Sequence, residues 1–544
     1  MDRKAIILKV FTRKYQLSLK PGAIEYLLSI LSEHEIEDEQ IQDAMEYVAK
    51  EYMKQDDCTT IVNRENLEKI YALMQLGGQD AGATQNTLLD PDELDPEQHL
   101  YFVNAREMPR WLYSNERKAF EKSEGKPNLG GAPAARAQFL RDRHNIIKQV
   151  VLRNENFSPP AIAGRDRDNY LKLTSTKNLL GRTGERFLLF GMLTHAQDGR
   201  LCLEDPEGKV ILDISETGPS EGLFTEGCFV LVEGDYTEEE IFQVIAMGHP
   251  PSERRAAARS IYGHIDFLGK GATTVAEDDQ FADGMHRFQD LAFMCASDLW
   301  LDKPKTLRGL RKILDGYVEN NFVPRLFIFC GNFTSKDVGQ GSGLDLIRYQ
   351  ENFDQLADLL TSYPRIVSES HFLFIPGPLD PWGSSTLPRP PIPTSFTSRL
   401  ASKLPKAHFG SNPCRIKFCG QEIVVFRHDL MAKMLRNLVG VKPEVDSGDL
   451  KRYLVQTILD QCHLSPFMLS VQPTIWEEDH ALRLYPMPTS VILADKYERY
   501  ELTYEGCHVF NPGTFQGTLF GFSTYYPATG RSEASFLEED EDNY

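Results

Sequence analysis

Apolar residues near the N-terminus recur every three or four positions, which is the spacing of one face of an α-helix. Pro21-Gly22 precedes the first run, and Asn63 is a suitable N-cap for the third. The apolar positions of the three runs are Ile24, Leu27, Leu28 and Leu31; Ile41, Met45, Val48 and Tyr52; and Leu67, Ile70 and Leu73. The pattern predicts a small all-α domain over residues 1–76.

Between residues 187 and 250 the pattern changes to short apolar runs separated by turn residues such as Asp198-Gly199 and Gly234-Asp235. Five runs are candidate strands: Phe187–Leu193, Leu201–Glu204, Val210–Ile214, Cys228–Glu233 and Ile241–Ala246. Five strands in so short a stretch are typical of a small OB-type β-barrel. A fragment of a β-sandwich is the alternative that this pattern leaves open.

From residue 288 to residue 530, short apolar strands alternate with runs at helical spacing. The candidate strands are Leu291–Ala296, Leu326–Cys330 and Phe372–Ile375, and the candidate helices are Lys305–Tyr317 and Leu344–Ser362. Strands that alternate with helices indicate an α/β domain whose strands are joined by crossover connections.

Three segments lack such periodicity. Residues 77–105 are rich in Gly, Asp, Pro and Gln and are predicted to form an acidic flexible linker, and residues 251–287 a second linker. Residues 531–544 end in the run Glu538-Glu539-Asp540-Glu541-Asp542 and are predicted to be an acidic tail.

Charge is distributed unevenly along the chain. The chain has 59 Lys and Arg against 79 Asp and Glu, a formal net charge of −20, which excludes a protein that wraps nucleic acid over its whole surface. Residues 106–186, the basic lead-in segment, carry 17 Lys and Arg against 9 Asp and Glu. This excess indicates an anionic partner, docking against the acidic remainder of the chain, or simply a solvated surface.

The nine cysteines include no CxxC pair, and several lie within apolar runs. They are expected to be reduced core residues rather than zinc ligands. The N-terminus lacks the layout of a signal peptide, and no apolar run approaches the roughly 18 residues of a membrane span. We therefore expect a soluble intracellular protein without membrane association.

Three predicted strands of the α/β domain run into short polar loops, Ser297-Asp298-Leu299-Trp300, Gly331-Asn332-Phe333 and Pro376–Asp380. Loops at the carboxyl ends of such strands commonly form active sites. Their order and spacing resemble the calcineurin-like phosphoesterase family. In that family, DxH, GD, GNH[DE] and GHxH motifs hold two metal ions that activate water.

Most metal ligands of that family are missing from these loops. The substituted positions are Trp300 (for His), Asn332 (for Asp), and Pro378 and Leu379 (for Asn and His), while Asp298 and Asp380 keep the ligand type. The sequence contains no HxH, and its one DxH, Asp142-Arg143-His144, follows no strand. We predict a degenerate site without catalysis, metal or cofactor. The alternatives are ordinary turns, or an active phosphoesterase that takes ligands from elsewhere, such as His371, His463 or His508.

The predicted barrel offers aromatic residues on which bases could stack, but few Lys or Arg beside them. The aromatic residues are Phe187, Phe190 and Phe229, and the acidic residues crowding one hairpin are Glu233, Asp235, Glu238, Glu239 and Glu240. This composition favours a protein-binding barrel over one that binds single-stranded nucleic acid, which stays as the alternative.

An OB barrel followed by an inactivated phosphoesterase domain resembles the B-subunits of eukaryotic replicative DNA polymerases. Longer motifs resemble the DNA polymerase epsilon branch of that family: Arg110–Lys118, Leu203–Pro206, Ser297–Asp302, Phe329–Phe333, Leu387–Pro391, Asn412–Ile416 and Asn511–Phe515. The likeness spans nearly the whole chain and is weakest in the linker and the acidic tail.

This resemblance implies a non-catalytic accessory subunit in the nucleus. The barrel and the phosphoesterase-like domain would bind the zinc-bearing C-terminal domain of the catalytic subunit. Residues 1–76 would dock on the GINS part of the replicative helicase and so link the helicase to leading-strand DNA replication. Histone-fold small subunits would belong to the same complex, and contact with DNA would arise mainly at the level of that complex.

Overall fold

The computed structural model describes residues 3–15, 17–33, 41–53, 61–71, 94–123, 125, 133–158, 170–218, 220–339, 342–381, 385–439, 449–516 and 520–537. It divides into two compact units. The first contains residues 1–94, 256–266 and 270–284, and the second contains the rest of the chain. Among the described helices, none combines the length and the apolar character needed to cross a membrane.

The first unit is mainly helical. Its helices are α1 (Arg3–Leu8), the π-helix η1 (Lys9–Lys14), α2 (Pro21–Glu33), α3 (Ile41–Met53), a helix over residues 64–71, and most of α6 (Arg255–Tyr262) and α7 (Val275–Met285). Pro21 begins α2, where a proline costs no helical hydrogen bond. Leu27, Met45 and Leu67 meet in the core, in agreement with the predicted helical faces, while Leu73 of the third face lies outside the described residues.

Two predictions for this unit need correction. Residues 1–76 are not entirely helical, because β1 (Ser18–Leu19) pairs in parallel with β2 (Ile61–Val62). Residues 251–287 are not only a linker, because they form α6 and α7. Lys50 in α3 and Glu277 in α7 form an ion pair of 3.1 Å, so α7 belongs with the N-terminal helices.

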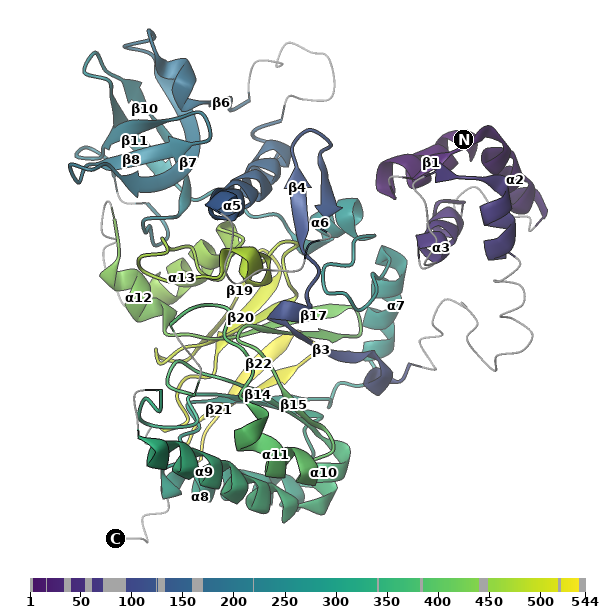
Figure 1. Ribbon diagram of the computed structural model, residues 1–544, viewed down its shortest axis with the longest axis vertical. Coiled ribbons are helices and arrows are strands. Elements are labelled where there is room, and N and C mark those ends of the chain that lie inside the picture. The colour runs from purple at the N-terminus through teal and green to yellow at the C-terminus, as the bar shows by residue number, and fades with distance from the viewer. Residues whose placement is uncertain are drawn as a thin grey trace. The chain divides into compact units, whose positions relative to one another are not determined.

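The second unit contains a closed β-barrel (Figure 1). Its strands are β6 (Leu173–Thr174), β7 (Arg186–His195), β8 (Leu201–Asp205), β9 (Gly208–Asp213), β10 (Phe229–Tyr236) and β11 (Ile241–Gly248). They follow the order β10-β11-β9-β8-β7-β6, and β10 also pairs with β7, which closes the barrel and excludes a sandwich fragment. The five predicted strands are confirmed, although β6 and the 3-10 helix η5 (Thr176–Leu179) precede the predicted start at residue 187.

The basic lead-in segment is largely structured. It forms the hairpin β4 (Trp111–Ser114) and β5 (Ala119–Lys122), followed by the long helix α5 (Pro133–Arg153). One face of α5 packs on the barrel, where the rings of His144 and Phe190 lie 5.2 Å apart. Its other face meets the 3-10 helix η6 (Trp476–Leu482), where Arg143 bonds Asp479 at 2.5 and 2.9 Å.

The remainder of the second unit is built on two six-stranded sheets. The first has the order β15-β14-β13-β12-β21-β22. Its strands are β12 (Phe293–Ser297), β13 (Leu326–Cys330), β14 (His371–Ile375), β15 (Ala407–Phe409), β21 (Phe522–Tyr526) and β22 (Arg531–Ser535). Strands β12 to β15 run parallel, which confirms the predicted crossover connections. Strand β22 lies inside the predicted acidic tail, whose residues 538–544 are outside the described part of the chain.

The second sheet has the order β19-β20-β18-β17-β16-β3. Its strands are β3 (Leu100–Asn104), β16 (Cys414–Phe418), β17 (Gln421–Arg427), β18 (Ser490–Ala494), β19 (Tyr500–Tyr504) and β20 (Cys507–Asn511). Strand β3 comes from the end of the predicted linker 77–105, so the linker prediction is wrong there, and residues 77–93 are outside the described residues. The two sheets face each other, with the rings of Phe293 and Phe418 5.2 Å apart.

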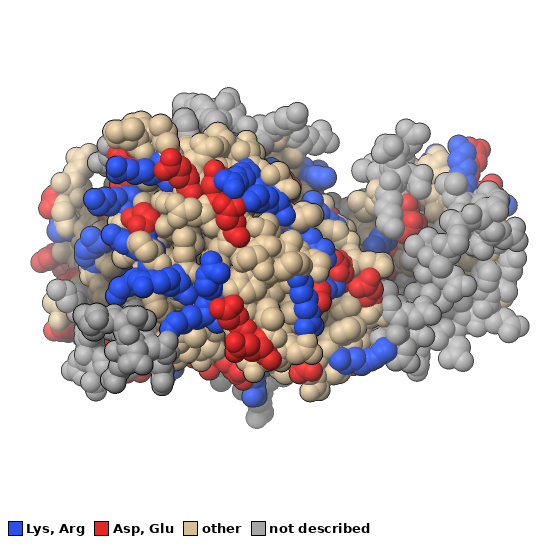
Figure 2. Space-filling model, turned by 90° about the horizontal axis from the view of Figure 1, so that it is seen from below, with Lys and Arg blue, Asp and Glu red and all other residues tan. Residues whose placement is uncertain are grey.

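Helices cover the outer faces of the two sheets (Figure 1). The first sheet carries α8 (Pro304–Glu319), α9 (Gly343–Thr361), α10 (Pro364–Glu369) and α11 (Thr394–Lys403), and the second carries α12 (Leu430–Arg436) and α13 (Asp449–Asp460). Figure 2 shows the α8–α11 face with Lys and Arg interspersed with Asp and Glu. The architecture is compatible with the predicted phosphoesterase-like fold. The eight described cysteines are buried and unbridged, as expected, and Cys58 is outside the described residues.

Candidate functional site

The three loops of the predicted degenerate site come together at one edge of the first sheet. They follow β12, β13 and β14, which are parallel neighbours, so their carboxyl ends share that edge. Asn332 donates to Asp298 Oδ1 from its backbone nitrogen at 3.1 Å and from Nδ2 at 2.8 Å. Its own Oδ1 accepts from the backbone nitrogen of Leu379 at 2.8 Å. Asn332 therefore links the first loop to the third by hydrogen bonds. In the family pattern, the position of Asn332 would hold a metal-binding carboxylate.

A buried arginine neutralises Asp298. Arg427 ends β17 on the second sheet, and its Nη2 lies 2.9 Å from Asp298 Oδ1, with neither side chain exposed. Its Nε donates to the carbonyl of Gly331 at 2.7 Å, and its Nη1 to Asp429 Oδ1 at 2.7 Å. Burial disfavours the charged guanidinium, but the carboxylates of Asp298 and Asp429 outweigh that effect and raise the pKa of Arg427. The positive charge beside Asp298 is thus supplied by the side chain of Arg427.

Asp380, the other retained carboxylate, is occupied by hydrogen bonds from the surrounding loops. Its Oδ1 accepts from the backbone nitrogen of Phe333 at 2.8 Å and from the hydroxyl of Tyr349 at 3.0 Å. Its Oδ2 accepts from the backbone nitrogen of Gly377 at 2.6 Å. Burial raises the pKa of Asp380 to about 6, and these hydrogen bonds oppose the rise. The side chain clamps the second loop to the third.

The remaining positions contribute apolar or neutral groups. Trp300, Pro378 and Leu379 are half-buried. The indole nitrogen of Trp300 and Oδ2 of Asp298 are buried without a hydrogen-bond partner among the described residues. Within the described part of the chain, no group of three or more His, Cys, Asp and Glu side chains is arranged to hold a metal ion.

The histidines considered as substitute ligands lie elsewhere. His371 begins β14, at the opposite end of that strand from Asp380, and its Nδ1 lies 3.0 Å from His408 Nε2. His463 lies 3.4 Å from Asp479, and His508 bonds the hydroxyl of Ser532 at 2.9 Å. The three histidines therefore contact three different partners and do not come together as ligands of one site.

The DxH triplet of α5 forms no site either. Asp142 accepts from the backbone nitrogen of Tyr113 at 3.1 Å, whereas His144 turns to the barrel and packs on Phe190 and Phe229. Residues two apart on a helix point in different directions, so these two side chains cannot share a metal ion. Burial lowers the pKa of His144 to about 4.

The sequence reasoning missed two arginines of this site. Besides Arg427, Arg389 is buried, and its Nη1 lies 3.5 Å from the carbonyl of Arg427. Burial and the neighbouring Arg427 charge lower the pKa of Arg389 to about 10. A charged residue at the end of the apolar run Ile423–Phe426 was the available signal for Arg427, because a charge in that position needs a buried partner.

The barrel's aromatic residues, on which bases would stack under the alternative of nucleic-acid binding, are not available to bases. Phe187, Phe190 and Phe229 are all buried, and the latter two rings stack on each other with centroids 6.0 Å apart. The barrel's own aromatic residues therefore serve packing.

Comparison with known proteins decides the family. The family described as the B-subunit of DNA polymerase alpha/epsilon matches residues 293–501, and that described as the OB-fold domain of DNA polymerase epsilon subunit 2-like proteins matches residues 133–251. DNA polymerase epsilon subunit 2 of Homo sapiens is 36% identical over 535 residues, covering 96% of each chain. The chain belongs to the DNA polymerase epsilon B-subunit family.

Other members of the DNA polymerase epsilon B-subunit family are similarly close. DNA polymerase epsilon subunit 2 of Bos taurus is 35% identical over 532 residues and 96% of both chains. The DNA polymerase epsilon B-subunit of Schizosaccharomyces pombe is 33% identical over 563 residues, covering 96% of this chain and 94% of its own. Membership confirms the resemblance based on the sequence motifs. The second family match also confirms an OB fold and extends that domain to include α5, well before the predicted start at residue 187.

Proposed function

We propose that this chain is a non-catalytic accessory subunit of the DNA polymerase epsilon complex, with a phosphoesterase-like domain that has lost its metal ligands. The observation that carries the proposal is the ion pair between Arg427 and Asp298. A guanidinium fixed on the first carboxylate supplies the positive charge that a metal ion would otherwise supply. The other ligand positions hold side chains that do not bind metal, so packing takes the place of a reactive centre. These residues are Trp300, Asn332, Pro378 and Leu379.

The scaffolding role is supported by the firm joint between the barrel and the α/β domain. The side chain of Gln461, after α13, bonds both the backbone nitrogen and the carbonyl of Phe229 at 2.7 Å. The backbone nitrogen of Leu223 donates to Thr457 at 2.8 Å. Arg143 of α5 adds its bonds to Asp479. Buried hydrogen bonds fix the barrel and the α/β domain relative to each other. The barrel and the α/β domain therefore offer one continuous surface to the C-terminal domain of the catalytic subunit.

The remaining partners are proposed from the family resemblance. Residues 1–76 would dock on the GINS part of the replicative helicase, and the histone-fold small subunits would join through the same complex. The work of such a protein is leading-strand replication in the nucleus, where it ties polymerase to helicase.

A pull-down of the tagged full-length chain from nuclear extract, read by mass spectrometry, tests the assembly. We expect the catalytic subunit to be recovered in near-stoichiometric amount. A matched chain lacking residues 1–76 should keep the catalytic subunit and lose GINS. Recovery of GINS without those residues would contradict the docking role, and absence of the catalytic subunit would contradict the scaffolding role.

Metal content and turnover test the loss of catalysis. Purified protein is expected to hold no stoichiometric Mn, Fe or Zn and to leave a chromogenic phosphodiester intact. Asp298→Asn serves as the matched variant. Bound metal together with hydrolysis that disappears in Asp298→Asn would show an active phosphoesterase.

A further inference from the structure

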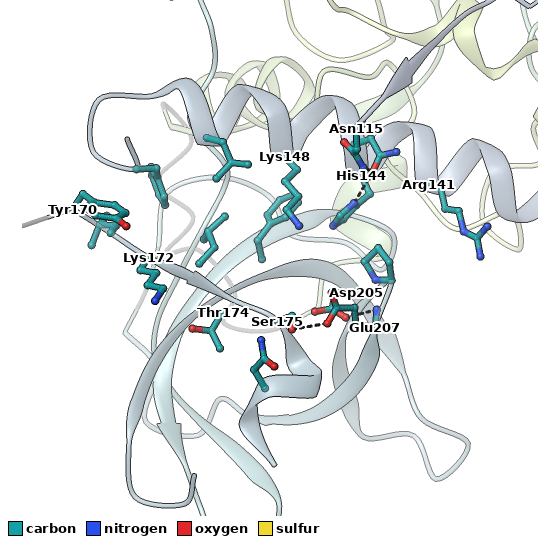
Figure 3. Close-up of a pocket in the computed structure, with 18 residues that line it drawn as sticks. Asn115, Arg141, His144, Lys148, Tyr170, Lys172, Thr174, Ser175, Asp205 and Glu207 are labelled. Carbon is teal, nitrogen blue, oxygen red and sulfur yellow. Dashed lines mark hydrogen bonds between the residues drawn. The ribbon is translucent and has the colours of Figure 1, made fainter. Parts of the chain in front are cut away.

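A groove lies between α5 and the β6 side of the barrel (Figure 3). It consists of two adjoining hollows of about 590 and 600 Å³ that share Lys172, Leu173, Thr174 and Asn178. One wall is α5, and the other is β6 with η5 and the turn between β8 and β9. The groove is therefore formed mostly by the basic lead-in segment.

Four cations distributed along this groove lack an acidic partner. Arg141 and Lys148 come from α5, seven residues apart and so on one helix face, and Lys172 and Lys177 come from the opposite wall. Among the described residues, none of the four side chains forms a hydrogen bond or an ion pair. Lys148 is half-buried, and Figure 3 shows its amine directed into the groove. A half-buried ammonium without a counter-charge indicates a place for an anionic ligand.

The acidic groups that face these cations are already engaged. Asp205 accepts hydrogen bonds from Thr176, Glu207 and Gly208, at 2.7 or 2.8 Å each. Glu207 accepts from the hydroxyl of Ser175 at 2.8 Å. At the far end, Arg182 pairs with Glu185 and Arg186 with Asp235, so those two arginines add little net charge. The hydrogen bonds to Asp205 and Glu207 come from neutral donors and fix the two carboxylates in place without removing their charge, so the four cations outnumber the two carboxylates in the lining.

The remaining lining mixes neutral polar groups, the ring of Tyr170 and apolar side chains such as Leu152 and Leu173. Asn115, Asn145 and Asn178 offer amide donors and acceptors between the cations. Tyr170 is half-buried at one end, beside Leu171, which is 50% exposed. Phosphates need cations spread along a path, and bases need amides and a ring face beside that path.

We propose that this groove binds single-stranded nucleic acid. Arg141, Lys148, Lys172 and Lys177 take the phosphates, and Tyr170 stacks on a base. The site does not use the buried aromatic rings of the barrel as stacking platforms. It goes beyond the accessory role proposed above, since it gives this protein a direct contact with a template or displaced strand.

The test measures fluorescence anisotropy of a labelled oligothymidine of about 20 nucleotides with the full-length chain. Four phosphate contacts predict an affinity that falls about 50-fold between about 50 mM and about 200 mM salt. The variant Lys148→Ala/Lys172→Ala/Lys177→Ala should bind at least about tenfold more weakly at low salt, with a slope that is smaller by about 2. Tyr170→Ala should lose roughly tenfold, while Tyr170→Phe keeps the affinity because a phenyl ring still stacks.

The matched control removes three positive charges from α8 and its N-cap, as Lys303→Ala/Arg308→Ala/Arg311→Ala. It should bind like the wild type, and thermal unfolding should show that all variants remain folded. Equal affinity of the groove variant and the wild type would overturn the proposal, as would equal losses in the control. If poly-L-glutamate binds in the groove and the oligothymidine does not, the groove is a docking site for an acidic protein segment, and the proposal is likewise overturned.

Discussion

Arg427 Nη2 lies 2.9 Å from Asp298 Oδ1, and both side chains are fully buried. The pair connects the two sheets at the edge where the predicted degenerate site lies. Asp298 itself adopts φ +57°, a left-handed conformation that Asp tolerates better than most residues. That turn directs its carboxylate to the guanidinium, so the first loop depends on Arg427 for its charge balance.

Replacing Arg427 by Met is expected to destabilise the protein by about 3–5 kcal/mol, because it leaves a buried carboxylate without a counter-charge. The double variant Arg427→Met/Asp298→Asn should recover part of the loss. Chemical denaturation measures both. The matched control Arg399→Met breaks an exposed pair with Asp358 and should cost under about 1 kcal/mol. A single variant no worse than this control would contradict the buried-pair argument.

Asp460 predicts a pH dependence of stability. Burial raises its pKa to about 7, against hydrogen bonds from Ser252 and Tyr504. A carboxyl group whose pKa is higher in the folded state contributes stability below its unfolded pKa, near 4, and loses it as pH rises through 7. The free energy of unfolding should therefore fall between about pH 4 and pH 7 by roughly 2–4 kcal/mol from this group. Asp460→Asn should flatten that part of the profile, and an unchanged profile would refute the assignment.

Arg143 is predicted to hold α5 and its barrel to the α/β domain. Arg143→Ala leaves the buried Asp479 without the guanidinium that pairs with it. The free energy of unfolding should therefore fall by about 3–5 kcal/mol, and hydrogen exchange in α5 should become faster. Arg117→Ala, which removes an exposed pair with Glu121, is the matched control and should change stability by under about 1 kcal/mol. Exchange in α5 that is equally slow in both variants would show that other contacts hold the joint.

Gly234 lies at a register irregularity in β10, where an added Cβ would overlap the backbone carbonyl of Gln243. Because backbone cannot yield as a flexible side chain can, Gly234→Ala should destabilise the barrel by about 1–3 kcal/mol or more. Gly248→Ala, at the end of β11, meets nothing within 4 Å and should be close to neutral. Thermal unfolding compares the two variants, and similar midpoints would disprove the close approach.

Local patterns were sufficient for most elements. The strands of the barrel, the first three parallel strands of the α/β domain and the helices α8 and α9 lie where periodicity predicts them, because the spacing of apolar residues records which side of an element is buried. The boundaries failed where an element depends on distant partners. Strand β3 looked like linker because its five residues become a strand only by pairing with β16, more than 300 residues away.

The same distinction between local pattern and distant contact applies to the predicted degenerate site. The sequence alone determined which residues, Trp300, Asn332, Pro378 and Leu379, stand at the positions predicted to have lost metal ligands, because residue identity and order are local properties. That Arg427 meets Asp298, 129 residues before it, was decided only by the tertiary structure. The reason is physical: no periodicity encodes which buried charge faces which, since that depends on how the two sheets pack and bring the ends of β12 and β17 together.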